Sequence, residues 1–113
     1  MVKKYIPKRG DIIYLNFNPT KGHEQGGFRP ALVLSSDTFN NFTKMVIVCP
    51  ITTNTKEFPT HYLLKNTKKI NGSVLCEHLI SIDYETRNLK YLEKCSEEDC
   101  DNIIDLIDSF YKK

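Results

Sequence analysis

Short apolar runs separated by turn-forming residues limit how this 113-residue chain can fold more than any other feature. The runs are rich in β-branched and aromatic residues, which are typical of strands, and they span residues 11–17, 30–35, 45–51, 61–65, 73–82 and 90–92. The 73–82 run fits either one long strand or a strand with a bulge. Pro50 indicates a bulge or a sheet edge just before Thr52. Residues 36–44 contain turn formers and are expected to connect two strands.

A second pattern marks the C-terminal part of the chain. Apolar residues recur at helical spacing, at positions 100, 103, 104, 107 and 111, which predicts an amphipathic helix over roughly residues 97–111. Ser96 and Asp99 form a variant of the capping box at its start. Strands followed by one helix predict a mainly β (α+β) fold, in which a strongly bent antiparallel sheet or partly open barrel packs against the helix. We expect a single domain over residues 1–113.

Composition argues against several classes of protein. The chain is 40% hydrophobic and 27% charged, and no apolar run approaches the roughly 20 residues that a membrane span needs. The basic N-terminus has no apolar segment behind it, so we expect no signal peptide and a cytoplasmic protein. No two of the cysteines have C-x-x-C spacing, and the three histidines show no metal-ligand spacing. We therefore expect reduced thiols, no metal and no cofactor.

The charge is distributed unevenly along the chain. Residues 1–82 carry 11 Lys and Arg against 5 Asp and Glu, whereas residues 83–113 carry 5 against 9, and the net charge is +2. A basic body with an acidic C-terminal segment is compatible with phosphate binding on the body. A solvated helix with mixed charges produces the same asymmetry, so both interpretations stay open.

The segment Pro19–Pro30, PTKGHEQGGFRP, follows the first expected strand and is the strongest candidate for a functional loop. Its three glycines let a ligand approach the backbone closely, and the two prolines stiffen its ends. Glu24 and Arg29 put an acid and a cation on this loop, which suits an anionic ligand that gains or loses a proton. Thr52, with Thr53 beside it, is the third polar candidate. A salt bridge between Glu24 and Arg29, and ordinary strand pairing by the threonines, would explain the same residues without a site.

Three blocks of the sequence resemble the MazF toxins, also called the PemK or Kid-type family, of bacterial toxin–antitoxin systems. The blocks are Arg9–Ser35 (RGDIIYLNFNPTKGHEQGGFRPALVLS), Cys49–Thr53 (CPITT) and Gly72–Asp83 (GSVLCEHLISID), and they follow the family's order and spacing. The EQGG-x-RP run is the most specific motif. His78 departs from the pattern, because many relatives carry Gln there. The exchange either alters base preference or is a harmless surface change.

The resemblance implies a sequence-specific, metal-independent endoribonuclease that cuts single-stranded RNA, chiefly mRNA, and thereby arrests translation and growth. It also implies an SH3-like barrel of the CcdB/PemK-like fold and a homodimer whose interface helps to form the RNA groove. The expected inhibitor is a MazE-like antitoxin whose acidic, disordered tail fills that groove. Arg29 and Thr52 match the family's catalytic pair, and Glu24 matches an acidic residue implicated beside them.

Metal-free RNA cleavage proceeds by attack of the ribose 2′-OH on the adjacent phosphorus, which leaves a 2′,3′-cyclic phosphate and a 5′-OH. Arg29 suits bidentate contact with the phosphate, Thr52 can donate a hydrogen bond to it, and Glu24 is the candidate base. Single-strand binding needs aromatic platforms and cations, and the expected RNA-binding residues are Lys21, Gln25, Phe28, Thr53, Lys56, Phe58 and His78. The rival interpretations are a non-catalytic CcdB-like toxin that binds a protein such as DNA gyrase, and a barrel that binds RNA without cutting it.

Overall fold

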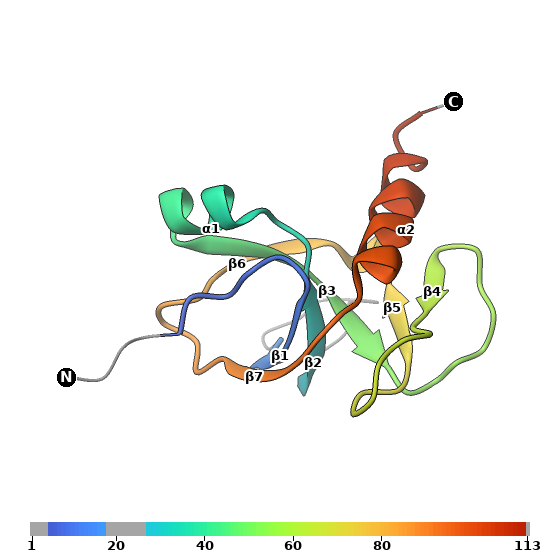
Figure 1. Ribbon diagram of the computed structural model, residues 1–113, viewed down its shortest axis with the longest axis horizontal. Coiled ribbons are helices and arrows are strands. Elements are labelled where there is room, and N and C mark those ends of the chain that lie inside the picture. Colours follow the sequence, from blue (N-terminus) through green and yellow to red (C-terminus); the bar gives the residue numbers. More distant parts are fainter. Residues whose placement is uncertain (1–4, 18–26, 113) are drawn as a thin grey trace.

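The structure is a computed structural model that describes residues 5–17 and 27–112. Within these ranges, seven antiparallel strands form one strongly bent sheet in the order β4-β5-β3-β2-β1-β7, with β6 also paired to β3 (Figure 1). The strands are β1 Asp11–Asn16, β2 Phe28–Val33, β3 Met45–Thr52, β4 His61–Leu63, β5 Ser73–Leu75, β6 Ile80–Asp83 and β7 Lys90–Lys94. The helices are α1 Asp37–Thr43, the short 3₁₀ helix η1 Cys76–His78, and α2 Glu97–Asp108.

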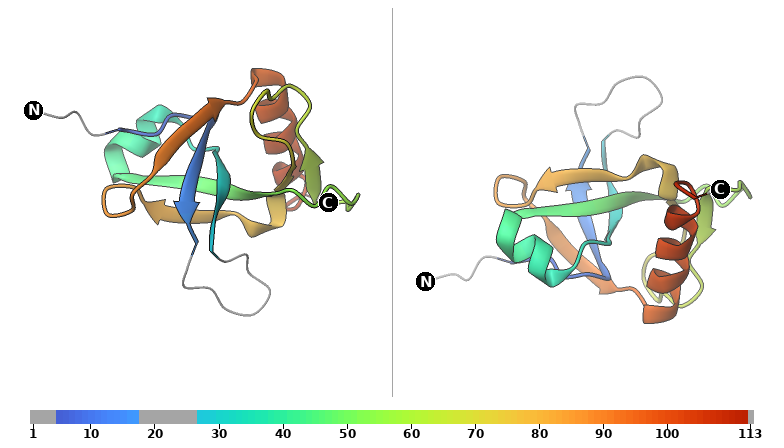
Figure 2. Two further views of the ribbon diagram at one scale, coloured as in Figure 1. Left: turned by 90° about the horizontal axis from the view of Figure 1, so that it is seen from below. Right: turned by 90° about the horizontal axis from the view of Figure 1, so that it is seen from above.

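The bent sheet is not closed into a full barrel. In the described part of the chain, no ladder joins β6 to β7, although both strands pair with the body of the sheet. The α2 helix packs against one side of the sheet, close to β4 (Figure 2). The predicted architecture, a partly open antiparallel barrel with a C-terminal helix, is therefore confirmed.

The central strand β3 changes partner along one edge. Its first half pairs with β6, and its last two residues pair with β5. The 73–82 run is neither one long strand nor a strand with a bulge, because η1 divides it into β5 and β6. Pro50 lies between the two ladders and opposite Ala31 of β2, with no shift in register. The expected bulge is therefore wrong, whereas the other alternative agrees with the structure, because the ladder between β2 and β3 ends at Pro50, just before Thr52.

Two apolar cores lie on opposite faces of the pleated strands. Ile12 and Leu32 belong to the core beneath α2, whereas their neighbours Ile13 and Ala31 belong to the core formed by β1, β2, β3 and β6. All four side chains are fully buried. This division follows from the strand pleat, which points successive side chains to opposite faces. It explains why β1 is apolar at consecutive positions.

The start of α2 is fixed by the Ser96–Asp99 pair. The Oγ atom of Ser96 accepts the N–H of Asp99 at 3.1 Å, as the capping pattern predicts. Asp99 is fully buried, and its carboxylate accepts the Tyr62 hydroxyl at 2.8 Å and the N–H groups of Lys65 and Asn66 at 3.3 Å. The same acid thus orders the helix start and the chain after β4. Among the described residues, no helix has the length and apolar character of a membrane span.

Residues 37–43 form the helix α1, where the sequence predicts only turns. Ser36 caps this helix, because its Oγ accepts the N–H of Phe39 at 3.2 Å. Asn40 is fully buried, and its side-chain amide donates to the carbonyl of Pro7 at 3.0 Å. Contacts with the distant N-terminal segment therefore decide the conformation, and local turn preference does not.

Candidate active site

Arg29 of β2 and Thr52 of β3 lie at adjoining ends of two paired strands. The ladder between these strands ends at the Ala31–Pro50 pair, and both residues lie two positions beyond it. Residues two apart in a strand share a face, so Arg29 and Thr52 lie on the face that carries the paired Ala31 and Pro50. Both residues are half-buried. The two residues expected to act on a phosphate therefore lie on one face of the sheet, beyond the end of one ladder.

Local contacts hold Thr52 in place. Its Oγ1 accepts the backbone N–H of Asn54 at 3.2 Å, which leaves the hydroxyl proton able to point elsewhere. Thr52 pairs with Ser73 at the start of β5. A Cβ atom on the preceding Gly72 would lie only 2.3 Å from the carbonyl oxygen of Thr52. Glycine is therefore required at this position for the backbone to approach Thr52 so closely.

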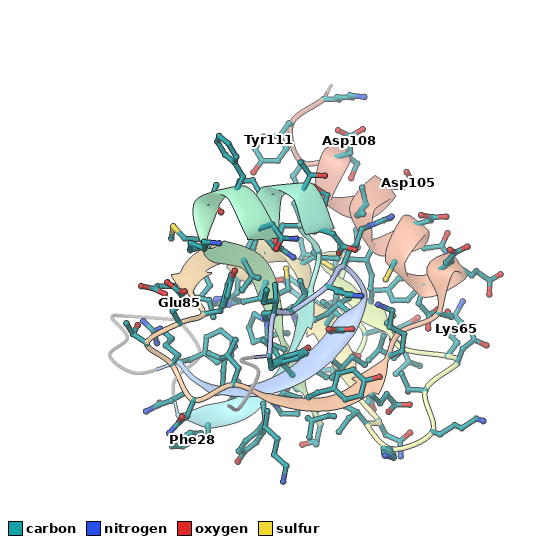
Figure 3. The ribbon with its side chains drawn as sticks, turned by 60° about the vertical axis from the view of Figure 1, so that its left-hand side comes forward. Phe28, Lys65, Glu85, Asp105, Asp108 and Tyr111 are labelled. Carbon is teal, nitrogen blue, oxygen red and sulfur yellow. The ribbon has the colours of Figure 1, made fainter. Side chains whose placement is uncertain are left out.

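An exposed aromatic pair lies at the start of β2, on the face of the sheet opposite to Arg29. The rings of Tyr14 and Phe28 stack with their centroids 5.6 Å apart and an angle of 19° between their planes. Phe28 is 60% exposed and lies at the outer edge of the molecule (Figure 3). The pair can stack against a planar ligand. Tyr14 is not among the sequence-predicted site residues, because alternation in β1 does not distinguish it from the core.

The loop between β3 and β4 carries three more of the predicted residues, Thr53, Lys56 and Phe58, all exposed. The loop begins with two successive side-chain turns. In the first, Thr52 accepts the N–H of Asn54, and in the second the Asn54 side-chain oxygen accepts the N–H of Lys56 at 3.2 Å. Beneath it lies a pocket of about 200 Å³, which we call the His61 pocket; it is lined by Thr52, Asn54, Lys56, Glu57, Phe58, His61 and Leu75. The loop therefore places a cation and an aromatic ring beside Thr52.

A polar cluster centred on Glu77 supports this pocket. One carboxylate oxygen accepts the Thr60 hydroxyl at 2.8 Å, and the other lies 3.0 Å from Nε2 of His61 and 3.7 Å from Nε2 of His78. Burial alone would raise the pKa of Glu77, but the hydrogen bonds from Thr60, from the backbone and from His61 lower it. The carboxylate is therefore ionised at neutral pH. Glu77 and His78 lie in the Gly72–Asp83 block, but no motif includes His61, which the pairing of β4 with β5 brings next to Glu77.

Three predicted site residues, Lys21, Glu24 and Gln25, lie outside the described residues. His78 lies in η1 and is half-buried; it meets the pocket only through Glu77. All four cysteines are unpaired thiols. Within residues 5–17 and 27–112, no three His, Cys, Asp or Glu side chains are grouped in a way that could hold a metal ion.

Sequence comparison finds relatives along most of the chain. Residues 8–111 match a family described as the PemK-like, MazF-like toxin of type II toxin–antitoxin systems. The endoribonuclease toxin MazF of Escherichia coli strain K12 is 41% identical over 87 residues, which cover 77% of this chain and 78% of that protein. The endoribonuclease MazF of Staphylococcus saprophyticus is 32% identical over 106 residues, which cover 88% of each chain.

Solved structures share the fold. The crystal structure of MazF from Deinococcus radiodurans superposes with a TM-score of 0.89 at 34% identity, and the match covers 97% of this chain and 100% of that one. A MazE–MazF complex from the same organism matches with a TM-score of 0.81 at 34% identity, over 95% of this chain and 96% of that one.

Proposed function

The chain belongs to the PemK-like, MazF-like toxin family of type II toxin–antitoxin systems, and we propose that it arrests growth by cutting single-stranded RNA, chiefly mRNA, at Arg29 and Thr52. Endoribonuclease activity is supported by the relatives in Escherichia coli and Staphylococcus saprophyticus, which are both named endoribonucleases. The observation that supports the site is the end of the β2–β3 ladder, because Arg29 and Thr52 each lie two residues beyond its last pair, on the same face of the sheet. A guanidinium and a hydroxyl can both donate hydrogen bonds to the oxygens of a phosphodiester.

The proposed reaction uses the ribose 2′-OH as the nucleophile and needs no metal. The oxygen attacks the adjacent phosphorus, the bond to the 5′-oxygen breaks, and this leaving oxygen takes up a proton from water or from the protonated base. The products carry a 2′,3′-cyclic phosphate and a 5′-OH. Arg29 contacts the phosphate oxygens with its planar fork, and the Thr52 hydroxyl donates a hydrogen bond to the same group. Both stabilise the negative charge that grows on those oxygens in the transition state. Glu24 is the proposed base that takes the proton of the 2′-OH.

RNA binding is proposed along the exposed surface around this pair. Phe28, stacked on Tyr14, offers a platform for an unpaired base at the start of β2, the strand that carries Arg29. Lys56 and Phe58 offer a cation and a second ring beside Thr52. The remaining proposed RNA contacts are Lys21, Gln25, Thr53 and His78. An RNA duplex keeps its bases stacked inside, so these platforms suit single strands.

The proposed protein partner is a MazE-like antitoxin, because MazE–MazF complexes are known for the Deinococcus radiodurans relative. An acidic, disordered tail would compete with RNA for the cations Arg29 and Lys56. We also propose that the single domain of residues 1–113 acts as a homodimer, and that it acts in the cytoplasm, where its mRNA substrate is translated.

The test is to incubate the purified protein with a long single-stranded RNA and with its duplex, both in EDTA. The expected result is cutting of the single strand at a limited set of sites, with the duplex intact. Intact single-stranded RNA would contradict the proposal. Growth arrest on expression without RNA cutting would instead favour a toxin that binds a protein target.

A further inference from the structure

Two cysteines hold the positions that pack together at the start of α2. Ser96 is the N-cap of this helix, so Cys95 precedes the cap and Cys100 is the fourth residue of the helix. Side chains at these two positions contact each other in the arrangement known as a hydrophobic staple. Both cysteines are 4% exposed and belong to the core beneath α2. The backbone N–H of Cys95 donates to the carbonyl of Gly10 at 2.7 Å, so this cysteine is also fixed from outside the helix.

The two thiols are in contact and differ in acidity. The Cys95 thiol donates a hydrogen bond to the sulfur of Cys100. This hydrogen bond and the positive charges of Arg9 and Lys94 lower the pKa of Cys100, against the opposite effect of burial. The same hydrogen bond and burial raise the pKa of Cys95, which keeps its proton. Because the thiolate is the nucleophilic form, Cys100 is the thiol that attacks first.

A cavity of about 340 Å³ gives small molecules access to both cysteines. It lies between the starts of α1 and α2, and its charged wall residues are Arg9, Asp37, Lys94 and Glu97. Two cations and two carboxylates balance each other, so the cavity does not favour a charged ligand. A water molecule takes up about 30 Å³ of the liquid, so a small neutral peroxide has ample room.

The remaining two cysteines provide a contrast within the same molecule. Cys49 is fully buried, Cys76 is 1% exposed, and neither lines this cavity. Burial raises the pKa of both thiols, to about 12 for Cys76. Of the four cysteines, Cys95 and Cys100 are therefore the pair that combines a contact, an access route and an ionisable thiol.

We propose that Cys95 and Cys100 form a redox-sensitive thiol pair, which a small hydroperoxide converts to a disulfide between the residue after β7 and the first turns of α2. Disulfides in cytosolic proteins are usually transient and redox-sensing, and a dithiol reductant returns the pair to two thiols by exchange. The inference goes beyond the proposed function and does not depend on RNA cutting.

The reaction with hydrogen peroxide has two steps. The Cys100 thiolate attacks one oxygen and the O–O bond breaks, which leaves a sulfenic acid at Cys100 and, after uptake of a proton, water. Cys95 then attacks the Cys100 sulfur, and its thiol proton leaves with the hydroxyl group as a second water molecule. The two sulfur atoms together lose two electrons, which the peroxide takes up.

The test treats the native wild-type protein with hydrogen peroxide, unfolds it, labels the remaining thiols with N-ethylmaleimide and maps the tryptic peptides. Trypsin cuts after Lys94 and Lys112, so residues 95–112 form one peptide that holds both cysteines. The expected result is that this peptide loses two hydrogen atoms and takes up no maleimide. This loss of labelling should be at least about tenfold faster than the loss at Cys49 or Cys76, and dithiothreitol should restore both labels.

Two variants separate the roles of the cysteines. In Cys95→Ser, the sulfenic acid at Cys100 has no thiol partner and should be trapped by dimedone. In Cys100→Ser, Cys95 should keep its maleimide label. Asp105→Asn, an exposed position further along α2, is the matched control and should form the disulfide at the wild-type rate (Figure 3). Melting curves check that each variant is folded.

Full labelling of residues 95–112 at peroxide concentrations that oxidise Cys49 or Cys76 would overturn the proposal. Conversion of Cys100 to a sulfinic acid in the wild type, without a disulfide, would also overturn it. The same holds if the disulfide forms as fast in urea-unfolded protein, because the fold then contributes nothing. These three outcomes are read from the wild-type protein alone, so a variant that fails to fold leaves the proposal testable.

Discussion

Arg29 of β2 and Thr52 of β3 each lie two residues beyond Ala31–Pro50, the last pair of the ladder between these strands. Because the Thr52 hydroxyl oxygen already accepts the N–H of Asn54, its proton can be donated to a phosphate. We expect Thr52→Val to lower the rate constant of cutting by about 10²–10³, the usual effect of removing one donor to a growing oxyanion. Single-turnover cleavage of a fluorogenic RNA measures it, with Thr52→Ser as the control that keeps the hydroxyl. A Val variant within twofold of the wild type would remove Thr52 from the mechanism.

Gly72 should matter for cutting although it cannot contact RNA through a side chain. A methyl group at this position would lie 2.3 Å from the carbonyl oxygen of Thr52, so the strand end must move. We expect Gly72→Ala to reduce the cleavage rate at least tenfold, because small displacements of catalytic groups are costly. The neighbouring Asn71→Ala, an exposed position, is the control. Equal rates for the two variants would show that Thr52 tolerates the displacement.

Glu93 should stabilise the fold in a pH-dependent way. Its carboxylate accepts the N–H groups of Lys68, Lys69 and Ile70 at 2.7–2.9 Å. Burial alone would raise the pKa of Glu93, but these backbone hydrogen bonds lower it. The carboxylate therefore stabilises the fold fully at pH values above its unfolded-state pKa, near 4.3. This stabilisation is lost as the pH falls through the lower folded-state pKa.

We therefore expect Glu93→Gln to reduce the free energy of unfolding by about 1–2 kcal/mol at pH 7 and by much less at pH 3. Urea unfolding at the two pH values measures this difference. Glu85→Gln changes an exposed carboxylate on the loop after β6 and serves as the control (Figure 3). A Glu93→Gln effect of equal size at both pH values would contradict the assignment to the charged carboxylate.

Cys100 should be the first of the four cysteines to react with an alkylating reagent. A hydrogen bond from the Cys95 thiol, together with the positive charges of Arg9 and Lys94, lowers the pKa of Cys100. Burial raises the pKa of Cys76 to about 12. Cys100 also lines a cavity of about 340 Å³ through which a small reagent can enter.

Brief iodoacetamide treatment and peptide mass mapping test the order of alkylation. We expect Cys100 to be labelled first, and Arg9→Gln to slow its labelling because a positive charge is lost. The thiolate is the reactive form, so a raised pKa protects the other buried thiols. Labelling of Cys76 as fast as Cys100 would contradict the expected order.

Much of the fold follows from local sequence patterns. The capping residues Ser96 and Asp99 locate the start of α2, and the β-branched runs locate most strands to within a few residues. Local sequence patterns fail where contacts with distant residues determine the secondary structure. Residues 37–43 are poor helix formers, yet α1 forms because Asn40 is buried against Pro7. Likewise, η1 divides the expected 73–82 strand, and the two parts, β5 and β6, pair with different stretches of β3.

In the candidate site, too, some residues can be predicted from local sequence patterns and others depend on distant contacts. Thr52 and the loop residues Lys56 and Phe58 follow from motif and composition, and the structure brings them to one pocket. His61 lies outside the motifs, and its hydrogen bond to Glu77 joins residues 16 positions apart through the β4–β5 pairing. Residue spacing alone therefore finds the residues on one loop and misses those that support it from neighbouring strands.

Mapping the RNA ends produced by the wild-type protein and by Arg29→Ala is the most direct test of the role of Arg29. The substrate is a single-stranded RNA with one mapped cut site, in EDTA, with a matched RNA that carries a 2′-deoxyribose at the attacking position. We expect 2′,3′-cyclic phosphate and 5′-OH ends from the wild type, cutting reduced at least 10²-fold in Arg29→Ala, and no cutting of the deoxy substrate. Undiminished cutting by Arg29→Ala, or cutting of the deoxy substrate, would contradict attack by the 2′-OH at a phosphate held by Arg29.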